Sequence, residues 1–105
     1  MEFITAVGLK EKLNNNESVS IIDIREQYEL DICKIDAVHI PMADVQERIN
    51  ELPLDIPVVI LCRSGKRASA LGNLLIAEHE MKNIFVLEGG ILAWIKDVDN
   101  KLEAY

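Results

Sequence analysis

Cysteine and histidine are scarce in this sequence of 105 residues, which contains two of each. These four residues, Cys33, His39, Cys62 and His79, are widely scattered and offer no zinc-ligand spacing. We therefore expect no metal site and no bound cofactor. The first seven residues lack the basic region of a signal peptide. The sequence thus predicts a cytoplasmic protein without a structural disulfide.

Basic residues are also few, with 11 Lys and Arg against 18 Asp and Glu and a net charge of −7. This balance argues against a nucleic-acid partner, because a polyanion needs a basic surface. It argues equally against an anionic membrane surface, and no apolar run approaches the ~18 residues that span a bilayer. Against this acidic background, the basic cluster of Arg63, Lys66 and Arg67 is informative.

Apolar residues make up half of the chain and alternate between short β-branched runs and helical patterns. This alternation predicts an α/β fold with a mainly parallel central sheet of about five strands and helices on both faces. We expect one domain over residues 1–105, with its oligomeric state left open. The expected strands are 20–24, 37–40, 57–61, 84–87 and an edge strand at 3–4, and the expected helices are 6–13, 27–31, 42–52, 66–80 and 91–95.

Cys62 directly follows the continuously apolar strand expected at 57–61 and precedes the longest helix. Ligands of open parallel sheets bind beyond the carboxyl ends of the strands. The unpaired N–H groups at a helix N-terminus favour an anion there, and nearby basic residues favour a thiolate over a thiol. Ser64 and Gly65 allow the backbone to curl so that its N–H groups converge. The sequence therefore predicts a reactive thiolate at Cys62; the alternative is an inert, buried cysteine.

Four segments resemble the rhodanese-like sulfurtransferases in the right order. They are Asp23-Ile24-Arg25-Glu26, Ile40-Pro41, Cys62-Arg63-Ser64-Gly65-Lys66-Arg67 and Gly89-Gly90-Ile91-Leu92-Ala93-Trp94. The segments 32–35 and 99–105 are particularly similar to rhodanese domains appended to enzymes that activate sulfur-carrier proteins. The chain departs from the family at Cys33-Lys34, where His-Ile is frequent, and at Asp36-Ala37, where Gly-Ala is frequent.

The resemblance implies a single rhodanese-like domain that transfers sulfur through a persulfide on Cys62. The donor would be thiosulfate or a persulfide, and the acceptor a thiol or a protein. Arg63, Ser64, Gly65, Lys66 and Arg67 would bind the anionic donor and the persulfide. Two alternatives remain open, a relay module that carries persulfide to a partner with little turnover, and a phosphatase. The Cys-x4-Arg spacing is one residue shorter than the Cys-x5-Arg of related phosphatases, which favours sulfur.

Two further groups of residues have alternative interpretations. Cys33 could resolve or accept the persulfide, but a small buried residue is the favoured interpretation. Asp23, Arg25 and Glu26 could line the mouth of the site, but an ion-pair cluster that fixes the end of a strand is favoured.

Overall fold

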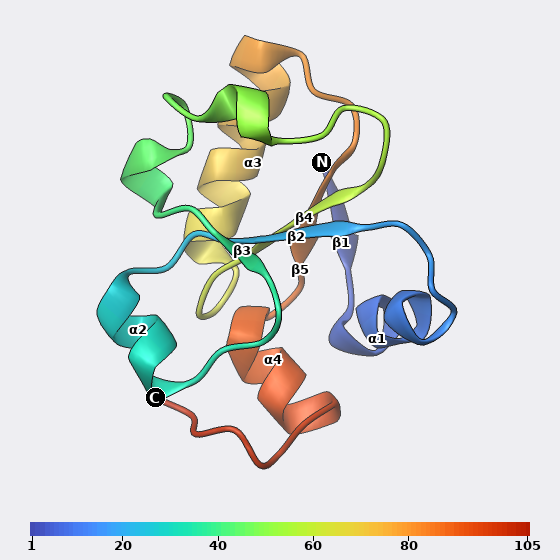
Figure 1. The fold of residues 1–105 in the computed structure, drawn as a ribbon, viewed down its shortest axis with the longest axis vertical. Helices are drawn as coiled ribbons and strands as arrows, with labels where there is room; N and C mark the ends of the chain where they lie inside the picture. Colours follow the sequence, from blue (N-terminus) through green and yellow to red (C-terminus); the bar gives the residue numbers. More distant parts are fainter.

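A five-stranded, all-parallel sheet forms the centre of the protein in the computed structural model, which describes residues 1–105 (Figure 1). The strand order is β1-β5-β4-β2-β3. The strands are β1 (Glu2–Ile4), β2 (Ser20–Asp23), β3 (Val38–His39), β4 (Val58–Leu61) and β5 (Ile84–Leu87). The helices are α1 (Ala6–Asn14), α2 (Gln27–Ile32), α3 (Lys66–His79) and α4 (Gly90–Asp97). These elements confirm the predicted α/β class and the parallel sheet.

Helices cover both faces of the sheet, as predicted (Figure 1). On one face, α3 packs on the strands through a cluster that includes Ala68, Leu71 and Leu75. On the other face, α1 and α4 form a second cluster that includes Leu9, Ile91 and Trp94. Each face of the sheet thus has its own hydrophobic core, which explains why the central strands read as continuously apolar.

β4 is the central strand and the one that positions Cys62. All four of its residues are buried. Ile60 pairs in register with Ile22 of β2 on one side and with Val86 of β5 on the other. Because both neighbours hold the strand, its carboxyl end is a fixed point at the middle of the sheet edge.

The prediction of a helix over residues 42–52 is wrong. Two short 3-10 turns stand there, η1 (Met42–Asp44) and η2 (Ile49–Glu51). Val45 and Leu52 are buried, so the helical spacing of apolar residues indicated burial correctly but not the backbone. The segment returns from the carboxyl edge of the sheet to the start of β4. A 3-10 turn rises about 2.0 Å per residue against 1.5 Å in an α-helix, which suits a stretch that must cover this distance.

β5 matches its predicted range, and the other elements differ from theirs by one or two residues at an end. Thr5 caps α1, since its Oγ1 accepts a hydrogen bond of 3.0 Å from the Gly8 N–H. None of the helices combines the length and the apolar character that crossing a bilayer requires.

Candidate active site

Cys62 lies at the carboxyl end of β4 and is fully buried, with 0% of its surface exposed. Its Sγ accepts a hydrogen bond from the Gly65 N–H at 3.0 Å and a longer one from the Ala68 N–H at 3.4 Å. Both donors belong to the first turn of α3 or to the residue that caps it. The sulfur therefore sits where backbone dipoles converge, which stabilises negative charge on it. We call residues 62–67 the Cys62 loop.

Two glycines give the Cys62 loop its shape. Gly65 caps α3 with φ at +100°, a left-handed conformation that other residues resist. Gly90 lies directly against the loop, and a Cβ on it would stand 2.4 Å from the Arg63 carbonyl oxygen. The Ile91 and Leu92 N–H groups donate to the carbonyls of Cys62 at 2.8 Å and Arg63 at 3.2 Å. The start of α4 therefore holds the loop backbone, which is a physical reason for the Gly89-Gly90 pair.

Arg67 does not stand free beside the sulfur but binds the carboxylate of Glu29 in α2. Its Nη1 and Nη2 donate to the two carboxylate oxygens at 2.8 and 2.7 Å. This bidentate pair lowers the pKa of Glu29 to about 2, against the opposing effect of burial. The same pair raises the pKa of Arg67, and the nearby Cys62 also contributes to that rise. Arg67 thus supplies positive charge near Cys62 while its hydrogen-bonding fork is already committed.

The low pKa of Glu29 predicts a loss of stability in acid. An unfolded glutamate titrates near 4.5, so the stabilisation by the Glu29 carboxylate is complete above that pH and is lost as the pH falls toward 2. The shift corresponds to at most about 3 kcal/mol of the free energy of unfolding, because the Arg67 side chain is 37% exposed and solvent weakens its attraction for Glu29. Urea unfolding between pH 6 and 2 should show a flatter pH dependence in Glu29→Gln than in the wild type. Glu88→Gln, at an exposed glutamate, is the matched control; parallel curves for wild type and Glu29→Gln would contradict the prediction.

Asp23 and Arg25 form a buried ion pair, as the favoured interpretation predicted. The Nη2 of Arg25 lies 2.8 Å from Oδ2 of Asp23, and the two side chains are 0% and 2% exposed. Arg25 also donates to the carbonyl of Cys33 at 2.9 Å. Burial lowers the pKa of Arg25, but the bonds to Asp23 and Tyr105 outweigh it and raise the pKa above its ordinary value. Glu26 takes no part in the pair; it is exposed and caps α2, where its N–H donates to Glu29 Oε2 at 2.9 Å.

Cys33 is buried, as expected, and its Sγ lies 4.0 Å from Nη1 of Arg25. Both cysteines are free. His39 donates from Nε2 to the Arg25 carbonyl at 2.7 Å. Cys33 and His39 therefore support the strand end rather than the Cys62 loop.

The remaining residues of the Cys62 loop point outward. Ser64 and Lys66 are exposed, and no ion pair in the structure involves Lys66. Arg63 is exposed but not free, because its Nε donates to the main-chain oxygen of Tyr105 at 2.6 Å and its Nη2 donates to the same atom. Of the three cationic groups that the sequence brought together, only that of Lys66 has no partner.

Sequence reasoning missed two residues that hold this site, Glu29 and Tyr105. Glu29 carries a weak signal, because it stands three residues after the capping Glu26, where a glutamate often serves a helix N-terminus. Tyr105 ends the segment 99–105 that resembles the family, but nothing in the sequence indicates its contacts. Its hydroxyl donates to Glu29 Oε1 at 2.8 Å across 76 residues of sequence. Burial raises the pKa of Tyr105, which keeps that hydroxyl a donor.

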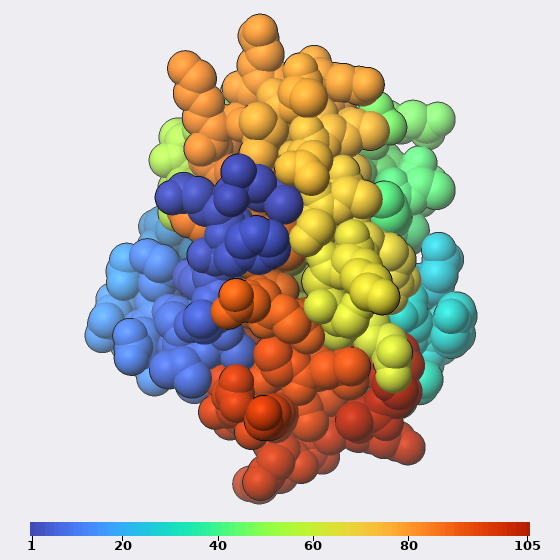
Figure 2. Space-filling model, turned by 180° about the vertical axis from the view of Figure 1, so that it is seen from behind, coloured from blue at the N-terminus to red at the C-terminus, as the bar shows by residue number.

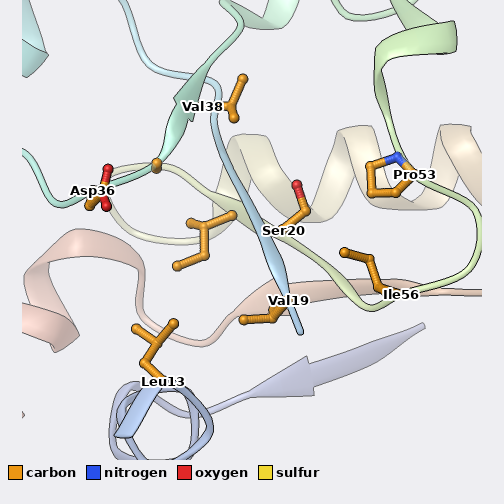
Figure 3. Close-up of a pocket in the computed structure, with 9 residues that line it drawn as sticks. Leu13, Val19, Ser20, Asp36, Val38, Pro53 and Ile56 are labelled. Atoms are coloured by element: carbon orange, nitrogen blue, oxygen red, sulfur yellow. The ribbon is translucent and has the colours of Figure 1, made fainter. Parts of the chain in front are cut away.

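The surface hollows of the protein lie elsewhere, and none is lined by residues 62–67. One hollow, lined mainly by apolar residues, lies at the amino ends of β2, β3 and β4, whereas Cys62 follows the carboxyl end of β4 (Figure 3). Its lining residues are Leu13, Val19, Ser20, Ile21, Asp36, Ala37, Val38, Pro53 and Ile56. No group of three or more His, Cys, Asp or Glu side chains comes together in a way that could hold a metal ion.

Comparison with known proteins identifies this arrangement. The sequence profile of the rhodanese-like domain matches residues 5–97. The chain belongs to the rhodanese-like domain family. Among curated relatives of this rhodanese-like chain, the putative sulfurtransferase YtwF of Bacillus subtilis is 39% identical over 92 residues, which cover 87% of each protein.

Two further matches support the assignment of this rhodanese-like domain. The probable adenylyltransferase/sulfurtransferase MoeZ of Mycobacterium tuberculosis is 30% identical over 105 residues, which cover 97% of this chain but 26% of MoeZ. This match confirms the similarity to rhodanese domains appended to larger enzymes. The crystal structure of a rhodanese-like domain protein from Staphylococcus aureus superposes with a TM-score of 0.82 at 30% identity, over 100% of this chain and 99% of that one.

Proposed function

We propose that this rhodanese-like domain is a sulfurtransferase that carries sulfane sulfur as a persulfide on Cys62. The main support for this proposal is the position of the Cys62 Sγ, which lies at the end of the central strand and accepts hydrogen bonds from the N–H groups of Gly65 and Ala68. These donors would stabilise first the attacking thiolate and then the anionic persulfide. The sulfurtransferase name of the relative that is 39% identical supports the same chemistry.

The reaction has two steps. The Cys62 thiolate attacks the outer sulfur of thiosulfate or of a persulfide donor. A new S–S bond forms while the donor's own bond to that sulfur breaks, and sulfite or a thiolate leaves with the electron pair. A thiophilic acceptor, a thiol or a protein, then attacks the outer sulfur of the Cys62 persulfide. The bond to Sγ breaks and the thiolate is restored, so that the cycle needs no external oxidant or reductant.

Persulfide relay to a protein partner is the second candidate function. It is favoured by MoeZ, in which the matching region forms about a quarter of a longer protein named as both adenylyltransferase and sulfurtransferase. In that setting a sulfur acceptor would be a macromolecule, and turnover on small molecules would be slow. The same Cys62 persulfide serves both candidates, so one experiment addresses them together.

The test is the intact mass of the reduced protein before and after incubation with thiosulfate and with a small persulfide. An adduct of about +32 Da, one sulfur atom, is expected with at least one donor and should disappear when cyanide or a thiol is added. Steady thiocyanate production indicates an enzyme of small donors, and a loaded protein with slow turnover indicates the relay. Absence of the adduct with every donor would refute the proposal, and hydrolysis of an aryl phosphate would favour the phosphatase.

A further inference from the structure

The segment after α4, residues 98–105, returns to the carboxyl edge of the sheet. Its C-terminus lies beside α2 in Figure 1, and in Figure 2 the dark-red C-terminal residues meet the yellow residues that follow Cys62. Val98, Leu102 and Tyr105 are partly buried against the core cluster of α1 and α4. We call residues 98–105 the C-terminal segment. Its packing brings its last side chain to the Cys62 loop.

Tyr105 uses its hydroxyl, its ring and its main chain in this contact. The hydroxyl donates to Glu29 Oε1 at 2.8 Å and accepts from Arg25 Nη1 at 3.1 Å. The ring centroid lies 5.1 Å from Cζ of Arg63 and 5.8 Å from Cζ of Arg25, within cation–π range. The main-chain oxygen accepts two N–H bonds from Arg63. The partly buried side chain of Tyr105 thus anchors the main-chain oxygen that binds the Arg63 guanidinium.

This anchoring has a consequence for anions that approach Cys62. Tyr105 occupies the Nε and Nη2 edge of the Arg63 guanidinium, so an oxyanion can form a bidentate pair of bonds on that edge only after Tyr105 releases it. Arg67 is held by Glu29, to which Tyr105 also donates. The sulfur itself is fully buried beneath the loop.

We propose that Tyr105 is a specificity-determining residue, which holds Arg63 in competition with small oxyanionic donors. The effect of Tyr105 on turnover rests on the proposed function. Binding of free thiosulfate to Arg63 is weakened by the free energy needed to displace Tyr105, whereas a donor that does not need the Arg63 guanidinium is unaffected. Tyr105 touches no reacting atom and acts through Arg63. The contact therefore selects against small oxyanions at a loop whose charge would otherwise attract them.

The test compares two alkylating reagents of similar size, anionic iodoacetate and neutral iodoacetamide, on the full chain. Their rates of reaction with Cys62 are read separately from those at Cys33 by peptide mass mapping. Tyr105→Ala should raise the ratio of the iodoacetate rate to the iodoacetamide rate by about tenfold, since it removes two ring contacts and two hydrogen bonds. Tyr105→Phe, which keeps the ring, should raise the ratio by a smaller factor. Tyr28→Ala, at an exposed tyrosine of α2, is the matched control and should leave the ratio unchanged.

The ratio separates the outcomes. An unchanged ratio in both Tyr105 variants refutes the proposal, even if both rates rise, because Tyr105 then only covers the loop. Alkylation needs no sulfur transfer, so this result does not depend on the proposed function. If the domain does turn over thiosulfate, Tyr105→Phe should also lower the KM for thiosulfate several-fold with a smaller change in kcat. A fall in kcat alone would contradict the assigned role.

Discussion

Replacing Cys62 with serine is expected to abolish the sulfur adduct and to lower sulfur transfer by roughly a thousandfold or more, the scale on which loss of a catalytic nucleophile acts. A serine hydroxyl is almost the same size and can still accept the N–H bonds of Gly65 and Ala68, so the loop should keep its structure. The serine hydroxyl remains protonated at neutral pH and forms no persulfide. Intact mass after exposure to donors and thiocyanate production measure the two effects.

Cys33→Ser is the matched control for this prediction. Cys33 is also buried but lies beside Arg25 at the end of α2, where its sulfur receives only a long contact of 4.0 Å. The variant should acquire the same adduct as the wild type. If the adduct persists in Cys62→Ser, or is lost in Cys33→Ser, the assignment of the persulfide to Cys62 alone is wrong.

Replacing Arg25 with methionine should lower the free energy of unfolding by about 3–5 kcal/mol, the cost of leaving a buried charge without its partner. Asp23 would keep its carboxylate at 2% exposure with no cation to compensate it. The Cys33 carbonyl and the Tyr105 hydroxyl would lose their donor as well. The midpoint and slope of urea unfolding at pH 7 measure the change.

Arg48→Met provides the comparison for that loss. Arg48 forms a bidentate pair with Glu51, but the two side chains are 39% and 50% exposed. A surface pair of this kind contributes about 0–1 kcal/mol. Equal losses in the two variants would contradict the structural role assigned to Arg25, because the difference between them comes from burial.

The sheet and the position of Cys62 were predictable because their determinants are local. Four consecutive apolar residues followed by Cys62 and Gly65 define a buried strand, its end and the cap of the next helix. The helix expected at 42–52 failed for a reason of the same kind. Apolar spacing reports which side chains are buried, and Val45 and Leu52 are buried, but it does not report the distance that the backbone must cover.

The polar framework of the candidate site was beyond local reasoning. Arg67 meets Glu29 across 38 residues of sequence, and Tyr105 meets Arg63 across 42. A cation in a loop has the same composition whether it faces solvent, a substrate or a distant carboxylate. The sequence therefore identified a basic loop correctly, whereas the partners of Arg63 and Arg67 depend on how α2 and the C-terminal segment come together.

The strand order has a consequence for the synthesis of the chain. β1 pairs only with β5, and α1 packs on α4, so both elements are synthesised well before residues 84–97 complete their packing. At 5–20 residues per second this interval lasts roughly 4–16 s. The Cys62 loop also reaches its final structure late, because Ile91 and Leu92 supply the N–H groups that hold its backbone. A nascent chain that stops before α4 would therefore expose the thiol of Cys62 in a loop that lacks the backbone hydrogen bonds from Ile91 and Leu92.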